Sequence, residues 1–389
     1  MGLYNFQFSL HMRDIQVESV DTPQQLESFI RFPWQIYRDD PYWVPPYLSQ
    51  LRKRLDIHRN PFFNYADRQL FCAYQDGKMV GTIAAIINHQ HNLQLKERTG
   101  FFGFFEVIND PQVAVALIEA ATTWLATKDI DCLRGPVNGA PTDEVGVLIF
   151  GHDSRPAIWE GHTPRYYQDL LEAQGFEKYD DVFAYEITNQ ELGNMLNGLP
   201  QKLLLVARNG RPHPQLVIRA TDKKNWGRDI LDAHLLYNTA FRSIPGHTDM
   251  RLEKFQQMVN SNKDLMDLDL TLIAKMGDAP MGFAVVLPDI NEVLCHFDGE
   301  ISYWGAARFY WYKWRIRTAC FKLLGVLPEY RGRGIEAQIM YEMVQRVLKK
   351  NYDRMEISLA SEKNIPMNRI IRRMGGRVYR IYRIYQRKI

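Results

Sequence analysis

The chain has 389 residues, of which 46% are hydrophobic and 24% charged, and its formal net charge is +3. This length predicts two or three domains, and this composition predicts an ordinary soluble globular protein. Its apolar runs are too short to cross a membrane, and its first residues lack the basic segment and apolar core of a signal peptide, so we expect neither.

The cysteines and histidines argue against a metal or redox centre. Cys72, Cys132, Cys295 and Cys320 are scattered without metal or redox spacing, which predicts buried thiols in a reducing cytoplasm. His89-x-His91 has no further ligand-spaced partner, so no metal site is expected there. We therefore expect a cytoplasmic protein that holds no metal ion.

The first predicted elements are strands and a helix. Phe71–Ala84 has the pattern of a hairpin, two apolar strands around a polar turn. Phe101–Val107 predicts a further strand and Val113–Thr127 a helix. Asp110 and Pro111 precede that helix, where an acidic side chain and a missing N–H suit a helix start but not an anion.

A long loop, Gly135–Tyr167, comes next, and a loop of this length inside a compact domain is usually functional or disordered. It is followed by a helical segment, Leu170–Phe176, which ends at a glycine before a last strand. The loop carries the polar residues Asn138, Thr142, Asp143, Glu144, His152, Asp153 and His162.

The second half repeats the first. Leu272–Val285 has the hairpin pattern of Phe71–Ala84, about 200 residues further on, and Ile370–Gly376 repeats Leu170–Phe176 at nearly the same offset. Glycines, prolines and polar residues cluster in Gln190–Pro214, which predicts a linker. We expect a tail (1–12), one copy (13–189), a linker (190–214) and a second copy (215–389). The strands of the second copy are predicted at Leu216–Ala220, Leu268–Ala274, Gly282–Leu287, Thr318–Val326, Met355–Leu359 and Arg377–Tyr385.

An aromatic segment, Ile301–Arg317, separates two strands of the second copy. Seven of its seventeen residues are aromatic and four are basic. We expect a helix here. It could pack over the sheet or between the copies, form one side of the site for a bulky or long substrate, lie on an anionic membrane, or stack on nucleic-acid bases.

A glycine-rich turn, Val326–Glu336, joins the apolar strand Ala319–Val326 to a helix whose apolar residues recur at helical spacing. The free N–H groups and the dipole at a helix start hold phosphate oxygens. Gly332 and Gly334 allow the close approach of a ligand, and Arg331 and Arg333 add charge. The turn is neither a P-loop nor a Rossmann loop, because their spacings are absent.

Within this turn, Pro328–Ile335 resembles the pyrophosphate loop of the GCN5-related N-acetyltransferase (GNAT) superfamily, arginine-x-x-glycine-x-glycine/alanine. Arg331 and Gly334 match that pattern, whereas Glu336 takes a small-residue position and is expected to turn its carboxylate away. The element order of both copies also matches that superfamily. The resemblance implies an α/β protein with two tandem copies of the mixed-sheet acyl-CoA N-acyltransferase fold, in which CoA inserts where the sheet opens.

The same resemblance implies acetyl-CoA or a longer acyl-CoA as donor, bound by the second copy alone. Asp110 and Pro111 stand where the first copy would need glycines and arginines. The implied contacts are main-chain groups of the strand and the residues of the turn, namely Leu324, Gly325, Val326, Arg331, Gly332, Arg333, Gly334 and Ile335.

The catalytic groups follow less directly from the family pattern. Its asparagine matches Asn364, but its tyrosine position holds Ile371, whose spacing predicts a core residue; Tyr379, Tyr382 or Tyr385 could replace that tyrosine. Amide formation needs a base for the amine proton, and the strand Ala319–Val326 contains no carboxylate. The candidate bases are Glu362, Asp298, Glu300, Asp143 and Glu144.

Charge separates the two ends of the chain. From Arg308 to Ile389 there are 20 Lys and Arg against 6 Asp and Glu, a charge of +14, so the rest carries −11. Such a basic region suits a CoA, a nucleic acid or an acidic membrane surface. We predict acyl transfer from acyl-CoA to the amine of a small molecule or peptide, with acceptor and acyl length left open. The alternatives are aminoacyl transfer from charged tRNA, against which the intact phosphate loop argues, and a non-catalytic CoA-binding scaffold.

Overall fold

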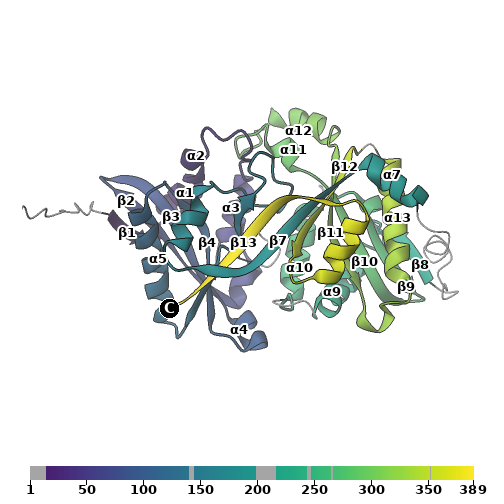
Figure 1. The fold of residues 1–389 in the computed structure, drawn as a ribbon, viewed down its shortest axis with the longest axis horizontal. Helices are drawn as coiled ribbons and strands as arrows, with labels where there is room; N and C mark the ends of the chain where they lie inside the picture. The colour runs from purple at the N-terminus through teal and green to yellow at the C-terminus, as the bar shows by residue number, and fades with distance from the viewer. Residues whose placement is uncertain are drawn as a thin grey trace, which may run out of the picture.

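The computed structural model describes residues 15–139, 144–198, 216–242, 247–263, 266–302, 304–350 and 352–389. Their strands join in one mixed sheet of 13 strands that runs the length of the molecule (Figure 1). The order is β1-β2-β3-β4-β5-β13-β7-β12-β11-β10-β9-β8, and β6 pairs with β13. The predicted α/β fold is therefore confirmed.

The first copy of the repeat supplies the strands at one end of the sheet. Its elements are β1 (Ile15–Ser19), α1 (Pro23–Arg31), α2 (Pro33–Ile36), α3 (Leu48–Leu55), η1 (Pro61–Asn64), β2 (Ala66–Gln75), β3 (Lys78–Asn88), α4 (His89–Leu95), β4 (Thr99–Val107), α5 (Pro111–Ala126), β5 (Cys132–Gly135), β6 (Val147–Phe150), α6 (Tyr166–Glu172) and β7 (Glu177–Thr188).

The second copy follows α7 (Asn189–Gly198), which lies largely within the expected linker. Its elements are β8 (Leu216–Ala220), α9 (Trp226–Phe241), α10 (Leu252–Asn262), η2 (Leu268–Leu270), β9 (Thr271–Met276), β10 (Ala279–Pro288), α11 (Asn291–Leu294), α12 (Gly305–Lys313), β11 (Thr318–Val326), η3 (Pro328–Tyr330), α13 (Ile335–Lys349), β12 (Arg354–Ser361), α14 (Ile365–Arg373) and β13 (Arg377–Lys388).

The predicted repeat corresponds to equivalent elements in the two copies. The hairpin β2–β3 turns at Asp76 and Gly77, both with positive φ, and β9–β10 turns at Gly277, also with positive φ. Polar turn residues that adopt this conformation are what the hairpin pattern requires. The predicted strand at Leu268–Ala274 begins later than expected, because Leu268–Leu270 form a 3-10 turn that Asp267 caps.

The two copies exchange their last strands. β13, from the second copy, lies between β5 and β7 of the first, while β7 lies between β13 and β12. Figure 1 shows β7 and β13 crossing together from one half of the molecule to the other, so that the C-terminus lies in the first half. Each copy therefore completes the other's sheet, which a sequence division at 189 and 215 does not show.

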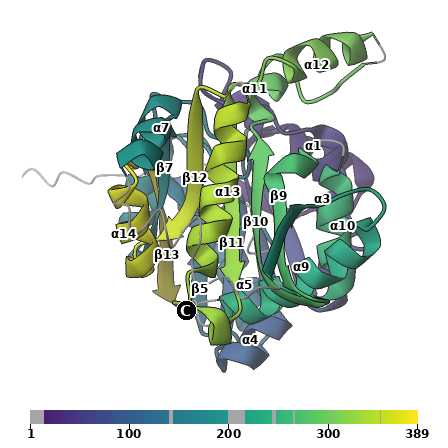
Figure 2. The same ribbon diagram turned by 90° about the vertical axis from the view of Figure 1, so that its right-hand side faces the viewer.

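Helices cover both faces of the second half (Figure 2). α13 packs on β9, β10 and β11 through Ile335, Ile339, Met343 and Val347, the face predicted from sequence. On the opposite face, α9 and α10 cover Ile273, Phe283 and Val285. Successive side chains of β10 point to opposite faces of the sheet, so one face packs against α13 and the other against α9 and α10.

The described residues contain neither a membrane-spanning helix nor a metal-binding cluster. No helix in the described part of the chain is long and apolar enough to cross a membrane. All four cysteines are free, and Cys72 and Cys320 are buried as expected, but Cys132 and Cys295 are partly exposed. No group of three or more His, Cys, Asp or Glu among the described residues is arranged to hold a metal ion.

Candidate active site

The sheet opens between β11 and β12. These parallel strands pair only from Thr318 to Phe321, opposite Arg354 to Ile357. The next residue, Lys322, is a bulge, because Phe321 pairs with Val286 and Leu323 with Val285. An extra residue bends its strand, so the bulge directs β11 away from β12 at the point where their pairing ends. Lys322 thus lies at the apex of a V-shaped opening.

A buried cluster of ionisable groups surrounds this apex. The Lys322 Nζ donates to Glu356 Oε2 at 2.8 Å and to Ser358 Oγ at 2.5 Å, both on β12. A second carboxylate, Glu160, comes from the long loop of the first copy and accepts from the Tyr379 hydroxyl at 2.8 Å. Strands of the second copy and a loop of the first therefore build the cluster together.

The two carboxyl groups have opposite protonation preferences. Burial, together with the charge of Glu160, raises the pKa of Glu356 well above its usual range despite the nearby Lys322. Burial alone would also raise the pKa of Glu160, but Lys322, a hydrogen bond with Glu356, and Arg380 together lower it. Ionising both of two close carboxyl groups is unfavourable, so the pair favours the proton on Glu356 and the negative charge on Glu160.

An apolar slot opens on the same face of the sheet. Leu287, Cys320 and Glu356 are successive cross-strand partners, so their side chains share one face. Leu287 lines the slot, as do Leu323, next to Lys322, and Trp159, next to Glu160. The other walls are apolar residues of α9 and α10, including Trp226, Ile230, Phe255, Met258 and Val259. Two residues of the slot's lining, Leu323 and Trp159, are therefore sequence neighbours of residues in the charged cluster.

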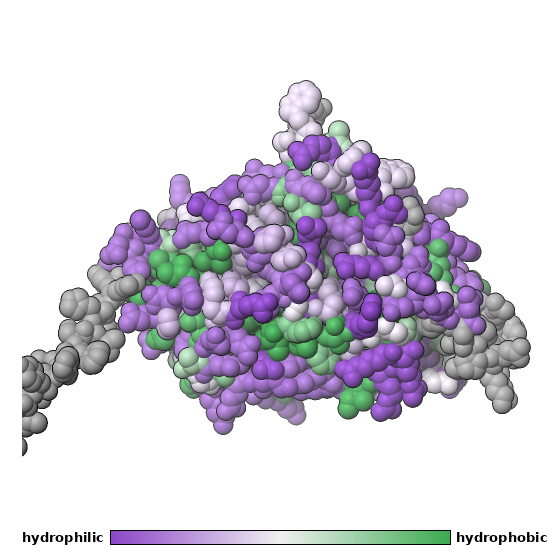
Figure 3. Space-filling view, turned by 45° about the horizontal axis from the view of Figure 1, so that its top comes forward, coloured by the Kyte–Doolittle hydropathy of each residue, from purple (hydrophilic) through white to green (hydrophobic). Residues whose placement is uncertain are grey.

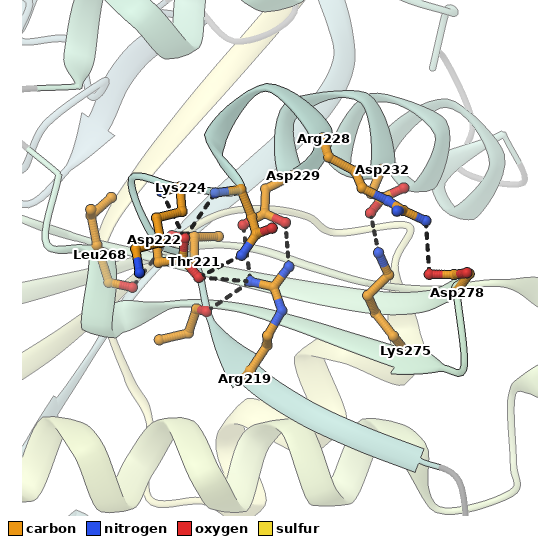
Figure 4. Close-up of polar contacts among 12 residues, drawn as sticks. Arg219, Thr221, Asp222, Lys224, Arg228, Asp229, Asp232, Leu268, Lys275 and Asp278 are labelled. Atoms are coloured by element: carbon orange, nitrogen blue, oxygen red, sulfur yellow. Dashed lines mark hydrogen bonds and ion pairs between the residues drawn. The ribbon is translucent and has the colours of Figure 1, made fainter.

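Ion pairs fix α9 over this slot (Figure 4). Arg219 of β8 donates to both oxygens of the buried Asp229, at 3.0 and 2.5 Å. Lys275 of β9 donates to Asp232 at 2.6 Å, one turn further along the helix. Charge-assisted and bidentate bonds of this kind are the strongest in proteins, so the first half of α9 is held against the sheet edge.

The predicted phosphate loop has the expected backbone. Gly332 and Gly334 have positive φ, and an added Cβ at Gly332 would meet no atom within 4 Å. The loop therefore leaves open space before the first turn of α13, whose N–H groups have no partner within the helix. This arrangement fits the pyrophosphate of a CoA.

Two side chains of the loop differ from expectation. Arg331 turns inward, with its Nε donating to Val326 O at 3.1 Å and its Nη2 to Ala240 O at the end of α9. It therefore ties the loop to α9. The carboxylate of Glu336 was expected to turn away, but Oε1 accepts from the Gly332 N–H at 3.2 Å, because a short turn separates the two groups. It occupies a donor that a phosphate would use.

The remaining predicted donor-site residues lie around the opening. Leu324, Gly325 and Val326 pair with β10 on one side only, since β12 has left the ladder. Gly325 has no room for a side chain, because Phe283 and Ala240 would lie within 3.0 Å of its Cβ. Ile335 is buried in the core, and Arg333 lies over the Tyr330 ring at 5.5 Å.

In the described part of the first copy, the corresponding gap beside β4 is filled by the chain itself. β4 and β5 pair from Thr99 to Phe101, and then Val137 N–H donates to Phe102 O at 2.7 Å. The Asn138 side chain accepts from the Phe104 N–H, also at 2.7 Å. At the helix start, Asp110 accepts from the Gln112 N–H at 2.9 Å, the kind of donor a phosphate would need.

The catalytic candidates from sequence do not meet in one place. Glu362 accepts from Lys178 at 2.9 Å near the surface, and Asn364 caps α14 by accepting from the Met367 N–H. Glu144 pairs with Arg54 at 2.7 Å in the first copy. Asp143 lies outside the described residues. Each of the three described side chains thus has a local partner that explains it.

The other candidates are also engaged elsewhere. Trp34 donates to Asp298, and Arg31 and Arg52 pair with Glu300, which joins the first copy to the second. Ile371 is buried in the core, as predicted. Among the tyrosines, Tyr379 and Tyr382 contact Glu160, whereas Tyr385 donates to Glu172 in the first half.

Sequence reasoning missed Lys322, Glu356 and Glu160. A signal was present for Lys322 and Glu356, because each is the lone charged residue within its predicted strand segment, Ala319–Val326 and Met355–Leu359. A charged residue is rarely buried without a paired partner, so two such residues in neighbouring strands point to each other. Glu160 had no comparable signal, since it lies in a long loop.

Comparison with known proteins agrees with this geometry. No protein-family model matches the chain. A tandem GNAT protein from the clavulanic acid biosynthesis pathway shares the fold with a TM-score of 0.57 at 12% identity, covering 96% of this chain and 98% of that one. Together with the opening and its glycine loop, this defines the class: the protein has a tandem GNAT acyltransferase fold, as the sequence predicted.

Two relatives define the family. The chain is 30% identical over 383 residues to the bacterial ceramide synthase of Caulobacter vibrioides (strain NA1000 / CB15N), which covers 97% of this chain and 98% of that protein. It is 29% identical over 370 residues to Protein YghO of Escherichia coli (strain K12), covering 94% and 93%. The chain belongs to the family of the bacterial ceramide synthase.

Proposed function

We propose that this protein transfers an acyl group from acyl-CoA to the amine of a long-chain, lipid-like acceptor and so forms an amide. The observation that carries the proposal is the shared face of the V-shaped opening, where the buried cluster of Lys322, Glu356 and Glu160 lies beside an apolar slot. The name of the relative supports it, since a ceramide is a fatty-acid amide of a long-chain amino alcohol.

The donor would lie along the opening. The main chain of Leu324–Val326 has lost its β12 partner. Apart from Val326 O, which accepts from Arg331, its outward-facing groups would bond the pantetheine arm and the thioester carbonyl. The pyrophosphate fits the loop at Gly332–Gly334 once the Glu336 carboxylate leaves the Gly332 N–H. Bound there, acyl-CoA supplies the activated acyl group as its thioester.

The acceptor's hydrocarbon chain would occupy the apolar slot. The slot holds about 60 Å³ of free space, so a long chain would fit only after the slot widens; each methylene group buried there would then contribute about 0.8 kcal/mol. Met258 and Met266 line the slot, and their flexible side chains let it widen for a chain. The amine end of such a molecule then lies at Trp159 and Leu323, next to the charged cluster.

Glu160 is the proposed proton acceptor. It is kept ionised by Lys322 and Arg380, and it faces the protonated Glu356, which offers a second carboxyl group to the amine. The neutral amine attacks the thioester carbonyl and gives up one proton to Glu160. The C–S bond then breaks, and the CoA thiolate takes that proton back from Glu160 and leaves as the free thiol. Tyr379 holds Glu160 in place through its hydroxyl.

The test compares matched carboxylate-to-amide variants. With a long-chain acyl-CoA and a long-chain amino alcohol as substrates, Glu160→Gln and Glu356→Gln should each lower kcat by roughly a hundredfold or more. Glu362→Gln, a surface carboxylate from the sequence candidates, should retain the rate. Loss of activity only in Glu362→Gln would refute the assignment, and CoA binding without turnover in the wild type would favour the scaffold alternative. We also propose that the protein acts in the cytoplasm, where its four cysteines stay reduced, and a peptide amine is the alternative acceptor.

A further inference from the structure

The helix α12 exposes an unusual set of aromatic side chains. Trp314 is 88% exposed, Trp304 87%, Tyr310 60% and Trp311 50%. Only Gly305 of the helix itself is buried. Large aromatic rings are normally buried because of their apolar area, and several exposed together on one short helix mark an interaction site.

The opposite side of α12 explains how the helix is held. Phe309 packs on Phe297 at 6.2 Å between ring centroids, and Tyr312 stacks on His296 at 3.8 Å. These rings fasten α12 to the body, and α11 contacts it as well. Figure 2 shows the helix standing out beyond the edge of the sheet. The exposed rings are therefore presented outward by a firmly anchored helix.

Basic residues accompany the exposed rings. Residues 304–317 include Arg308, Lys313, Arg315 and Arg317 and contain no acidic residue. The Arg315 guanidinium lies 3.5 Å from the Trp311 ring centroid, so charge and aromatic surface are joined. In Figure 3, α12 projects at the top as pale and purple residues, as expected of Trp, Tyr and Arg on this scale.

An arginine-lined pocket of about 470 Å³ lies at the base of α12. Its basic residues are Arg155, Arg315, Arg317 and Arg354, against the acidic Glu292 and Asp353. Glu292 already accepts from the Arg317 N–H at 2.9 Å. The Nε of Arg155 is buried and has no hydrogen-bond partner among the described residues. Four guanidinium groups against two carboxylates suit an anionic phosphate group.

We propose that α12 and this arginine pocket dock the protein on the surface of an anionic phospholipid bilayer. The indole and phenol rings enter the interfacial layer, where amphipathic rings are favoured, and the pocket takes one lipid phosphate. The arginines and Lys313 add attraction to negatively charged headgroups. A nucleic acid would use stacked rings along a groove, whereas here the rings project from one helix beside the arginine-lined pocket.

The surface is separate from the proposed reaction site. The pocket includes Thr318 and Arg354, at the starts of β11 and β12, whereas the glycine loop follows the end of β11. On the proposed function, which this inference extends but does not need, CoA enters from water at one end while the lipid acceptor comes from the bilayer at the other.

The test is co-sedimentation of the full chain with vesicles in the absence of substrates. Vesicles of phosphatidylcholine with phosphatidylglycerol should bind the wild type, and added salt should weaken binding. Trp311→Ser/Trp314→Ser and Arg155→Gln/Arg315→Gln should each reduce binding by roughly tenfold or more. The matched controls are exposed residues elsewhere, Leu231→Ser/Leu235→Ser on α9 and Arg372→Gln/Arg373→Gln on α14, which should bind as the wild type does.

Three results would overturn the proposal. The first is that the wild type does not bind anionic vesicles. The second is that the α9 or α14 controls lose as much vesicle binding as the α12 and pocket variants. The third is that the wild type binds single-stranded RNA more tightly than vesicles. Thermal unfolding shows whether each variant is folded. If a variant is not folded, the single substitution Trp314→Ser is tested instead, because this ring makes almost no packing contacts. Failure here leaves the acyl transfer untouched, because that is measured with soluble substrates and the Glu160→Gln variant.

Discussion

The carboxylate of Glu336 lies where an anion would bind the glycine loop. It lies in the first turn of α13, where the helix dipole favours a negative charge, and it accepts from the Gly332 N–H. A bound pyrophosphate needs the same donor and repels the same charge. The residue that departs from the family pattern is therefore a competitor for the site.

Replacement of Glu336 by alanine should tighten CoA binding. The gain should be on the order of 1 kcal/mol, or up to roughly tenfold in Kd, since one hydrogen bond and one like-charge contact are removed. Calorimetric titration with CoA measures it, and Glu329→Ala, an exposed acidic residue of the same loop, controls for net charge. A large loss of affinity in Glu336→Ala would show that the carboxylate helps to build the site.

The buried Asp289 gives stability a defined pH dependence. Burial and the nearby Glu292 raise its pKa from 3.8 to about 7, although Lys322 opposes this. The carboxyl accepts from the N–H groups of Ile158 and Asn291, which holds the first-copy loop against the second copy. Because the folded pKa lies above the unfolded one, the folded state binds the extra proton, and stability falls as pH rises from about 4 to about 7.

Asp289→Asn should remove this pH dependence. Its amide cannot ionise but keeps an oxygen for both N–H donors. The unfolding free energy of the variant should therefore rise relative to that of the wild type from pH 4 to pH 7. A shift of about three pKa units corresponds to roughly 4 kcal/mol at most. Urea unfolding at several pH values measures the difference, which should be constant above pH 7. A difference that does not change with pH would mean that Asp289 has an ordinary pKa.

At the scale of elements, equivalent strand–helix junctions of the two copies have opposite properties. β11 and α13 are joined by an open glycine loop, whereas β4 and α5 are joined by a turn that Asp110 caps. The opening beside β4 is also filled by Val137 and Asn138. We therefore expect CoA to bind the second copy and not the first.

One CoA should bind per chain. Gly334→Pro should abolish binding, since proline fixes φ near −65° and Gly334 has a φ of +89°. Asp110→Ala should leave CoA affinity unchanged and lower the unfolding free energy by about 1 kcal/mol through loss of the cap. Calorimetric titration measures the number of CoA molecules bound by each variant, and urea unfolding measures the stability of Asp110→Ala. A stoichiometry of two, or full affinity in Gly334→Pro, would contradict the assignment to the second copy.

At the scale of the whole molecule, the exchange of β7 and β13 makes the halves interdependent. β7 pairs with both β12 and β13 of the second copy, and β13 pairs with β5, β6 and β7 of the first. A half expressed alone would expose long unpaired strand edges in the middle of its sheet. The proposed boundaries therefore separate units of sequence that fold together.

The two halves, 13–189 and 215–389, should not fold when expressed separately. Each should show broad, poorly dispersed amide signals by NMR, while coexpression should give a stable complex that copurifies. The full chain should unfold in a single cooperative transition, because the sheet is continuous. Well-dispersed spectra from either half alone would show that the exchange is not needed for folding.

The local elements, their repetition and the glycine loop can be predicted from the sequence alone. Hairpins, the strand Thr318–Val326 and the helical face of Ile335, Ile339 and Met343 follow from periodicity and turn residues, which act between near neighbours. Only the tertiary structure decided the exchange of β7 and β13 and the meeting of Glu160 with Lys322 and Glu356. Those depend on strand pairing and burial between residues far apart in the chain, which no local pattern records.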